Sequence, residues 1–167
     1  IVKAAPVIWD IGVIKGKHAK GIVINSGNAN ACTGEQGKKD CERMAELFAE
    51  NTNCGKEEVL VCSTGVIGVN LPMDIMENGI NKLSQSLGYE NGFDAAEAIM
   101  TTDTYMKTAG CQIELSGKNV KFGGMAKGSG MIHPNMATML GFVTTDCAIS
   151  PEMLQKALSE CVADTFN

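Results

Sequence analysis

The segment AKGIVINSGNANACTG, residues 19–34, combines a strand signal with a loop signal directly after it. The run AKGIVIN is short, mostly apolar and contains β-branched residues, which predicts a buried strand over 19–25. The run NSGNANACTG contains small polar residues and glycines, which predicts a loop over 25–34 that can cap a following helix. A strand, a polar loop and a helix in this order are the beginning of an α/β pattern.

The alternation of helices and strands continues after this loop, from residue 35 to residue 100. Apolar residues recur at helical spacing over 35–51, and a second short strand is expected over 58–62. Further helices are expected over 72–87 and 93–100, the first of them with a proline in its opening turn.

The later part of the chain predicts antiparallel pairing instead. Strands over 106–115 and 119–125 are joined by Ser-Gly-Lys, which favours a hairpin. A strand over 138–145 and a helix over 151–165 follow. Early alternation and a late hairpin together predict an α/β (α+β mixed) fold with mixed sheets.

Composition limits the class of protein. The chain has 167 residues, of which 44% are hydrophobic, and this suits one domain with a sizeable core. The net charge is −5 and no basic stripe occurs, which argues against nucleic acid as a partner. No apolar run approaches the length of a membrane span, and no secretory leader is recognisable, so a cytoplasmic location is expected.

The cysteines number seven, an odd count with wide spacings and no C-x-x-C pair. With only two histidines, the spacing of a zinc site is not found either. We therefore expect reduced, mostly buried thiols and no metal. Cys32 could serve as a nucleophile in principle, but a buried thiol is the preferred interpretation.

The run KGSGMIHPNMATML, residues 127–140, holds the most suggestive chemistry. Thr138 follows the small residue Ala137 and precedes an apolar strand. Its hydroxyl could attack the Ala137 carbonyl, shift the acyl group from N to O, and leave an N-terminal threonine after hydrolysis. An ordinary strand threonine is the alternative. His133 is interpreted as a loop residue.

Three other motifs each allow a functional and a structural interpretation. STGVIG, residues 63–68, could supply oxyanion donors from Thr64 and Gly65, or could be a turn that needs glycine. Lys127 does not fit a phosphate-binding loop, and is either a cationic anchor for a carboxylate or a solvated lysine. TTDT, residues 101–104, could contact a substrate or form a cap or turn.

These four segments, NSGNANACTG, STGVIG, TTDT and KGSGMIHPNMATML, occur together in one order. In this order they resemble the ornithine acetyltransferase family, the bifunctional glutamate N-acetyltransferases of arginine biosynthesis. The resemblance extends over nearly the whole chain. It implies a layered sandwich of mixed sheets flanked by helices, similar to that of the serine-nucleophile aminopeptidases.

The resemblance also implies roles for particular residues. Thr138 is expected to cut the chain before itself and then to carry the acetyl group from N-acetylornithine to glutamate, with its freed α-amine as the base. Thr64 and Gly65 are expected to form the oxyanion hole, and Thr101 and Lys127 to bind substrate. Asp103 is expected to be structural. No bound cofactor is expected, and some relatives use acetyl-CoA as a second acetyl donor.

Residues 1–167 are expected to form one incomplete catalytic domain, with 1–137 ending an α part and 138–167 beginning a β part. Further substrate contacts of the family lie in its second half, so this chain by itself is expected to be inactive. Its β part and paired αβ units are the expected partners, with no nucleic acid and no membrane. Two alternatives stay open: an amino-terminal-nucleophile hydrolase that uses water as acceptor, and an inert fragment.

Overall fold

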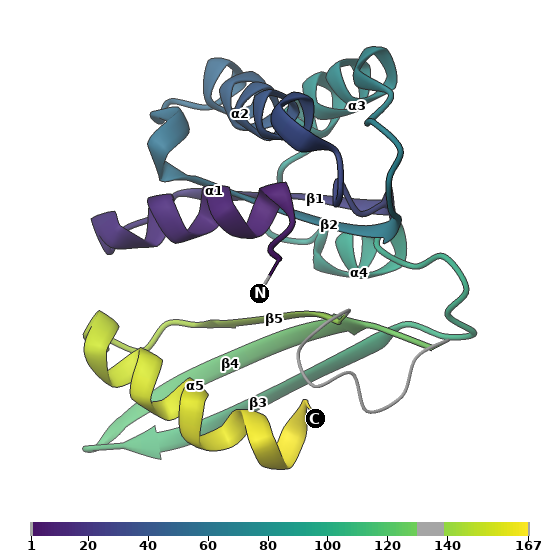
Figure 1. Cartoon of the computed structure of the whole chain (residues 1–167). Helices are drawn as coiled ribbons and strands as arrows, with labels where there is room; N and C mark the ends of the chain where they lie inside the picture. Colours follow the sequence, from purple (N-terminus) through teal and green to yellow (C-terminus); the bar gives the residue numbers. More distant parts are fainter. Residues whose placement is uncertain (1, 130–138, 167) are drawn as a thin grey trace. The chain divides into compact units, whose positions relative to one another are not determined.

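The computed structural model describes residues 2–129 and 139–166. The chain divides into two compact units, Ile1–Gly92 and Phe93–Asn167, which are described separately. The described residues include five α-helices, one parallel sheet and one antiparallel sheet (Figure 1). The predicted combination of helices and strands is confirmed, although neither sheet mixes parallel and antiparallel pairs within the part that the structure describes.

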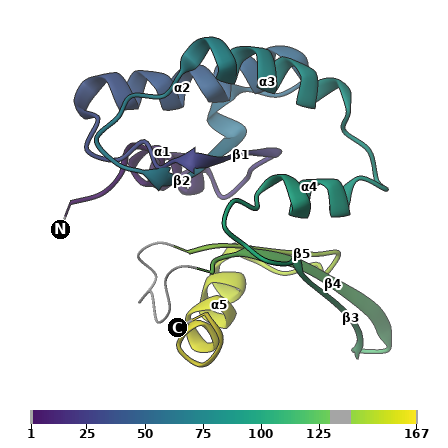
Figure 2. The same cartoon turned by 90° about the vertical axis from the view of Figure 1, so that its right-hand side faces the viewer.

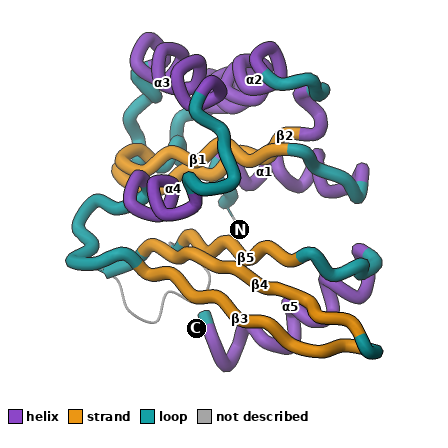
Figure 3. Tube along the Cα trace, turned by 180° about the vertical axis from the view of Figure 1, so that it is seen from behind, coloured by secondary structure: helices purple, strands orange, loops and turns teal. Residues whose placement is uncertain are grey.

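The first unit is built on a β-α-β segment. The strands β1 (Gly21–Asn28) and β2 (Val59–Val66) pair in parallel, and α2 (Gly34–Asn51) connects them. α2 and α3 (Met73–Gln85) lie side by side over one face of this sheet (Figures 1 and 3). Their apolar faces bury Met44, Val59 and Val61 completely, so the core lies between this helix pair and the sheet.

The helix α1 (Ala5–Val13) covers the free edge of β2 and was not predicted from the sequence. Its Trp9 Nε1 donates to the Val59 carbonyl at 2.9 Å, and its Asp10 Oδ1 accepts from the Val61 N–H at 2.8 Å. These bonds replace those that a further strand would make, since an unpaired strand edge exposes backbone donors and acceptors. Most residues of α1 are apolar and show little periodicity, and Pro6 in the first turn was the main available signal.

The carboxyl group of Asp10 makes the stability of this unit dependent on pH. Burial raises the pKa of Asp10 to about 6, against the opposite effect of its bond from Val61. The folded state therefore binds more protons than the unfolded state between about pH 4 and pH 6, and stability falls as the pH rises through that window.

We expect Asp10→Asn to raise stability at pH 7.5 by roughly 1 kcal/mol, because the amide keeps the acceptor oxygen and screening reduces the full effect of the half-buried charge. At pH 4 the gain should vanish. Urea unfolding at both pH values measures this difference. Asp146→Asn, a change at an exposed bond in the other unit, is the control. Equal stability of Asp10→Asn and the unmodified chain at pH 7.5 would contradict the prediction.

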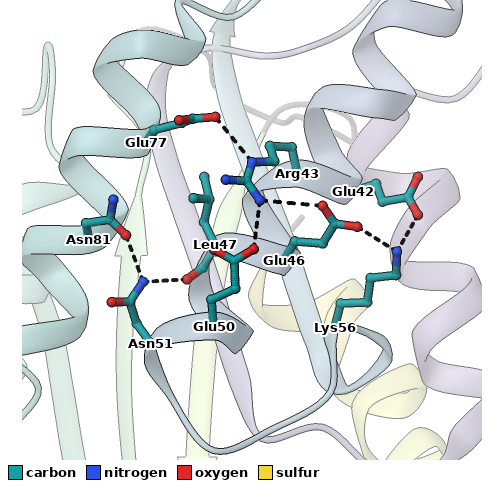
Figure 4. Close-up of polar contacts among 9 residues, drawn as sticks. All are labelled: Glu42, Arg43, Glu46, Leu47, Glu50, Asn51, Lys56, Glu77 and Asn81. Carbon is teal, nitrogen blue, oxygen red and sulfur yellow. Dashed lines mark hydrogen bonds and ion pairs between the residues drawn. The ribbon is translucent and has the colours of Figure 1, made fainter.

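A network of charged side chains holds α2 against its neighbours (Figure 4). Arg43 Nε of α2 bonds Glu77 of α3 at 3.2 Å. Lys56, in the short 3-10 turn η2 (Lys56–Glu58), bonds Glu42 at 2.6 Å and Glu46 at 2.7 Å. Exposed ion pairs of this kind contribute at most about 1 kcal/mol each. We interpret this network as structural.

The second unit contains the predicted hairpin. The strands β3 (Lys107–Leu115), β4 (Lys118–Lys127) and β5 (Leu140–Thr145) form an antiparallel sheet in that order. Ser116 and Gly117 connect β3 to β4 with φ values of 52° and 76°, as a type I′ turn requires. The strand and helix predicted after residue 138 also occur, within the described residues from 139 on.

Two further helices belong to the later part of the chain. α4 (Gly92–Ala98) precedes the sheet, and α5 (Pro151–Thr165) runs across one face of it (Figure 2). The Ser150 hydroxyl caps α5 by accepting from the Met153 N–H at 3.3 Å. None of the residues of α5 is buried. No helix among residues 2–129 and 139–166 has both the length and the apolarity to cross a bilayer.

The prediction of buried thiols is wrong for most of the cysteines. All seven are free, as expected, but only Cys41 is buried, while Cys32, Cys111 and Cys161 are exposed. Cys111 lies on the exposed strand β3 and Cys161 on the exposed helix α5. Cys32 lies in the loop after β1, where its φ is 58° and its side chain is exposed.

Candidate functional site

The residues predicted to form an oxyanion hole lie within β2 and not in a turn after it. Thr64 and Gly65 belong to the strand and pair in register with Ser26 and Gly27 of β1. The turn itself lies further on, at Gly68, whose φ is 76° and whose N–H donates to the Ala31 carbonyl at 2.8 Å. Both strands thus end in small polar residues and glycines on the same edge of a parallel sheet, which is where open α/β sheets bind ligands.

The two glycines at this edge are required by geometry. Gly27 and Gly65 have φ values of 143° and 138°, in a region that side-chain-bearing residues avoid. A Cβ atom added to Gly65 would lie 2.1 Å from the carbonyl carbon of Gly27. The structural interpretation of the STGVIG glycine is therefore supported, and the close contact also fixes the backbone on which Thr64 stands.

Three serine and threonine hydroxyls line these strand ends. Those of Ser26 and Ser63 are buried and have no hydrogen-bond partner among the described residues. Thr64, between Ser63 and Gly65, is half-buried. An unpaired hydroxyl beside a fixed backbone is available to donate to a developing negative charge.

The loop after β1 is fixed by its own side chains. The Asn30 N–H donates to Asn28 Oδ1 at 2.8 Å, and Asn30 Nδ2 donates to the Gly37 carbonyl of α2 at 2.8 Å. The Thr33 hydroxyl donates to Asn30 Oδ1 at 2.7 Å and does not cap α2. The expected side-chain cap of α2 is therefore not formed, and the fully buried Asn30 instead joins the loop to the first turn of α2, which gives this loop a structural role.

The residues predicted to bind substrate come together in the second unit. The Lys127 ammonium donates to Thr101 Oγ1 at 2.6 Å and to Asp103 Oδ2 at 3.1 Å. The Lys127 side chain is only 10% exposed, so the alternative of a solvated lysine is wrong. The hairpin produces this contact, because the register pairs Lys107 with Ala126 and so places the residues before β3 beside the end of β4.

Asp103 is the centre of this cluster, and its importance was not predicted from the sequence. Its side chain is 1% exposed and also accepts from Lys107 Nζ at 2.7 Å and from the Gly128 N–H at 2.9 Å. The hydrogen bond from Lys107 is the largest of several contacts that hold the pKa of Asp103 well below its usual range. The carboxyl is therefore ionised, and two ammonium groups share one carboxylate. Such a cluster keeps one positive charge for an anionic ligand.

The remaining predicted site residues, Ala137 and Thr138, lie outside the described residues, and so does His133, which was interpreted as a loop residue. Thr64 and Gly65 belong to the first unit, whereas Thr101 and Lys127 belong to the second. Among residues 2–129 and 139–166 there is no group of three His, Cys, Asp or Glu side chains that could hold a metal ion.

Comparison with known proteins gives a consistent result. A model of the ArgJ family matches residues 1–167. The arginine biosynthesis bifunctional protein ArgJ of Caldanaerobacter subterraneus subsp. tengcongensis is 54% identical over 99% of this chain and 41% of the relative. The ArgJ of Lactococcus lactis is 52% identical over 98% of this chain and 41% of its own length. The chain thus spans about two fifths of the curated relatives that it matches.

Two solved structures are also similar. The ArgJ of Bacillus halodurans is 41% identical with a TM-score of 0.71, and the match covers 83% of this chain and 72% of that chain. The ornithine acetyltransferase of Mycobacterium tuberculosis, solved in complex with ornithine, is 38% identical with a TM-score of 0.67 and the same coverage of both chains.

Proposed function

The chain belongs to the ArgJ family, and from this premise we propose that the protein, at the length of its curated relatives, transfers an acetyl group from N-acetylornithine to glutamate. The observation that carries the proposal is the buried Lys127 ammonium bonded to Thr101, since the family resemblance implied that both residues bind substrate. The ornithine bound to the M. tuberculosis relative supports the substrate class.

The proposed reaction begins with self-cleavage. The Thr138 hydroxyl attacks the Ala137 carbonyl, and the acyl group moves from the Thr138 nitrogen to its oxygen. Water then hydrolyses this ester and leaves a free α-amine on Thr138. A model α-amine has a pKa of about 7.7–8.0, so near neutral pH a useful fraction is unprotonated and can act as a general base.

Acetyl transfer then follows in two steps. The Thr138 hydroxyl attacks the acetyl carbonyl of N-acetylornithine, the C–N bond breaks, and ornithine leaves with the proton. The amine of glutamate attacks the resulting acetyl ester, which releases N-acetylglutamate and restores the hydroxyl. Acetyl-CoA would enter this scheme as a second donor of the same acetyl group.

The other residues have proposed roles in these steps. Thr64 and Gly65 stabilise the negatively charged oxygen of each tetrahedral intermediate, an interaction whose loss costs roughly 3–4 kcal/mol of barrier per donor. The close packing of Gly65 on Gly27 supports this role, because a rigid donor needs no reorganisation during reaction. Lys127 and Thr101 bind the carboxylate of the amino-acid substrate.

The wider organisation forms part of the same proposal. Residues 1–137 end an α part and residues 138–167 begin a β part of one catalytic domain. That domain is a layered sandwich of sheets flanked by helices, and its two parts remain associated in paired αβ units. The site of action is the cytoplasm.

Ornithine release from N-acetylornithine tests the reaction. For the full-length protein, we expect release to depend on glutamate and to be matched by an equal amount of N-acetylglutamate. An acetyl-enzyme that transfers to glutamate much faster than to water gives this result. Mass spectrometry measures both products.

Two outcomes would contradict this prediction. Release at the same rate without glutamate would identify a hydrolase that uses water as acceptor. An absence of release under all conditions would favour an inert protein. A reaction with acetyl-CoA in place of N-acetylornithine shows separately whether the second donor is used.

A further inference from the structure

The carboxylate of Asp103 connects two segments that carry the proposed substrate contacts. On one side it accepts from the Thr101 N–H at 3.4 Å, within its own turn. On the other side it accepts from Lys127 Nζ at 3.1 Å and from the Gly128 N–H at 2.9 Å, at the end of β4. One buried side chain thus fixes both the Lys127 ammonium group and the Gly128 backbone at the end of β4.

The bond to Asp103 determines where the Lys127 ammonium points. A lysine ammonium has three N–H donors on a flexible four-carbon stem. Asp103 Oδ2 and Thr101 Oγ1 each take one of them, and among the described residues the third donor is left for a ligand. With fewer fixed contacts the stem would be free to adopt other rotamers, and that donor would lose its direction.

The same arrangement orients the Thr101 hydroxyl. Its oxygen accepts from Lys127 at 2.6 Å, so its own hydrogen points elsewhere. The neighbouring Thr102 hydroxyl is paired differently, with Ser129 Oγ at 3.0 Å. A carboxylate beside Lys127 and Thr101 would therefore receive one bond from the ammonium and one from the hydroxyl.

We propose that Asp103 is a positioning residue for substrate binding, which aligns Lys127 and Thr101 as two neighbouring donors to one substrate carboxylate. This inference rests on the proposed function and adds a residue to it. Lys107 completes the arrangement: it bonds Asp103 at 2.7 Å and lies 4.8 Å from the ring centre of Tyr105. With two ammonium groups and one carboxylate, the cluster retains a single positive charge, which a single carboxylate neutralises.

The test is a double-mutant cycle on the full-length protein, with Asp103→Asn, Lys127→Met and the combination of both. Asp103→Asn keeps one acceptor oxygen and the shape of the side chain but removes the charge. We expect the KM for the amino-acid substrate to rise about 10- to 30-fold with kcat changed less than about threefold, since a charge-assisted bond to a substrate anchor acts on binding. In the Lys127→Met background the same change should raise KM less than about twofold, because residues that act through one another are not additive.

Two results would overturn the inference. An equal effect of Asp103→Asn in both backgrounds would show a purely structural role and overturn the inference. An unchanged KM in the single variant would do the same. Asp146→Asn is the matched control in the same unit, since Asp146 accepts only the exposed Lys121 N–H among described residues, and it should leave KM unchanged.

Two further measurements keep the inference testable. If Asp103→Asn does not fold, Lys127→Arg keeps the charge but displaces it, and should still raise KM at least about tenfold; a change below twofold would overturn the inference. Calorimetric titration with ornithine separates this inference from the proposed function. Binding that weakens in Asp103→Asn without any acetyl transfer by the unmodified protein would contradict the proposed function and support the positioning role.

Discussion

Replacement of Thr138 by alanine is expected to leave the chain uncut and to lower acetyl transfer at least about 10³-fold. The proposed mechanism uses this hydroxyl twice, first to cleave the Ala137–Thr138 bond and then to carry the acetyl group. Its α-amine exists only after cleavage, so one substitution removes both the nucleophile and the base. Losses of this size are typical when a covalent nucleophile is deleted.

Intact-mass measurement and an acetyl-transfer assay together check this prediction. The unmodified full-length protein should give two chains, one that ends at Ala137 and one that begins at Thr138, whereas Thr138→Ala should give a single chain. Thr138→Ser keeps a hydroxyl and should still be cut. Thr144→Ala is the matched control: Thr144 lies on the exposed part of β5, and its hydroxyl donates only to the Gly123 carbonyl at 3.2 Å among described residues. Cleavage before residue 138 in Thr138→Ala would rule out the self-processing mechanism.

The sequence pattern predicts the positions of the two strands of the first unit but not their full lengths. Both strands were predicted in the right places, over 19–25 and 58–62, but they extend to Asn28 and Val66. The extensions contain serine, threonine, glycine and asparagine, which a single-chain pattern interprets as loop. They are strands because each pairs with the other, and pairing between two segments is not visible in either one alone.

The proximity of Thr101 and Lys127 could have been predicted from the sequence. The central position of Asp103, which bonds both of them, could not. The Ser-Gly turn fixes the hairpin register, and this register places residues just before β3 beside residues just after Ala126. Which of the polar side chains in TTDT is buried depends on three-dimensional packing. The interpretation of Asp103 as structural agrees with its nearly inaccessible side chain, which accepts bonds from both proposed substrate residues.

Gly65→Ala is expected to have the largest effect on folding of any single methyl group added at the candidate site. A Cβ atom at Gly65 would lie 2.1 Å from the Gly27 carbonyl carbon and 2.6 Å from the Asn28 nitrogen. These are backbone atoms of the paired strand, so no side-chain rotation relieves the overlap. The φ of 138° adds strain of its own. The overlap and the backbone strain together should lower the free energy of unfolding by about 3 kcal/mol or more, or prevent folding.

Gly79→Ala in α3 is the matched control, because it makes the same chemical change with the opposite expected sign. No atom lies within 4 Å of a Cβ at Gly79, and the residue is in the interior of a helix. Alanine there should stabilise the chain by roughly 0.5–1 kcal/mol, since glycine is a poor helix former. Urea unfolding of the two variants and the unmodified chain measures both differences. If Gly65→Ala unfolded at the same urea concentration as the unmodified chain, the two strands could separate at little cost, and the rigid backbone proposed for Thr64 and Gly65 would not exist.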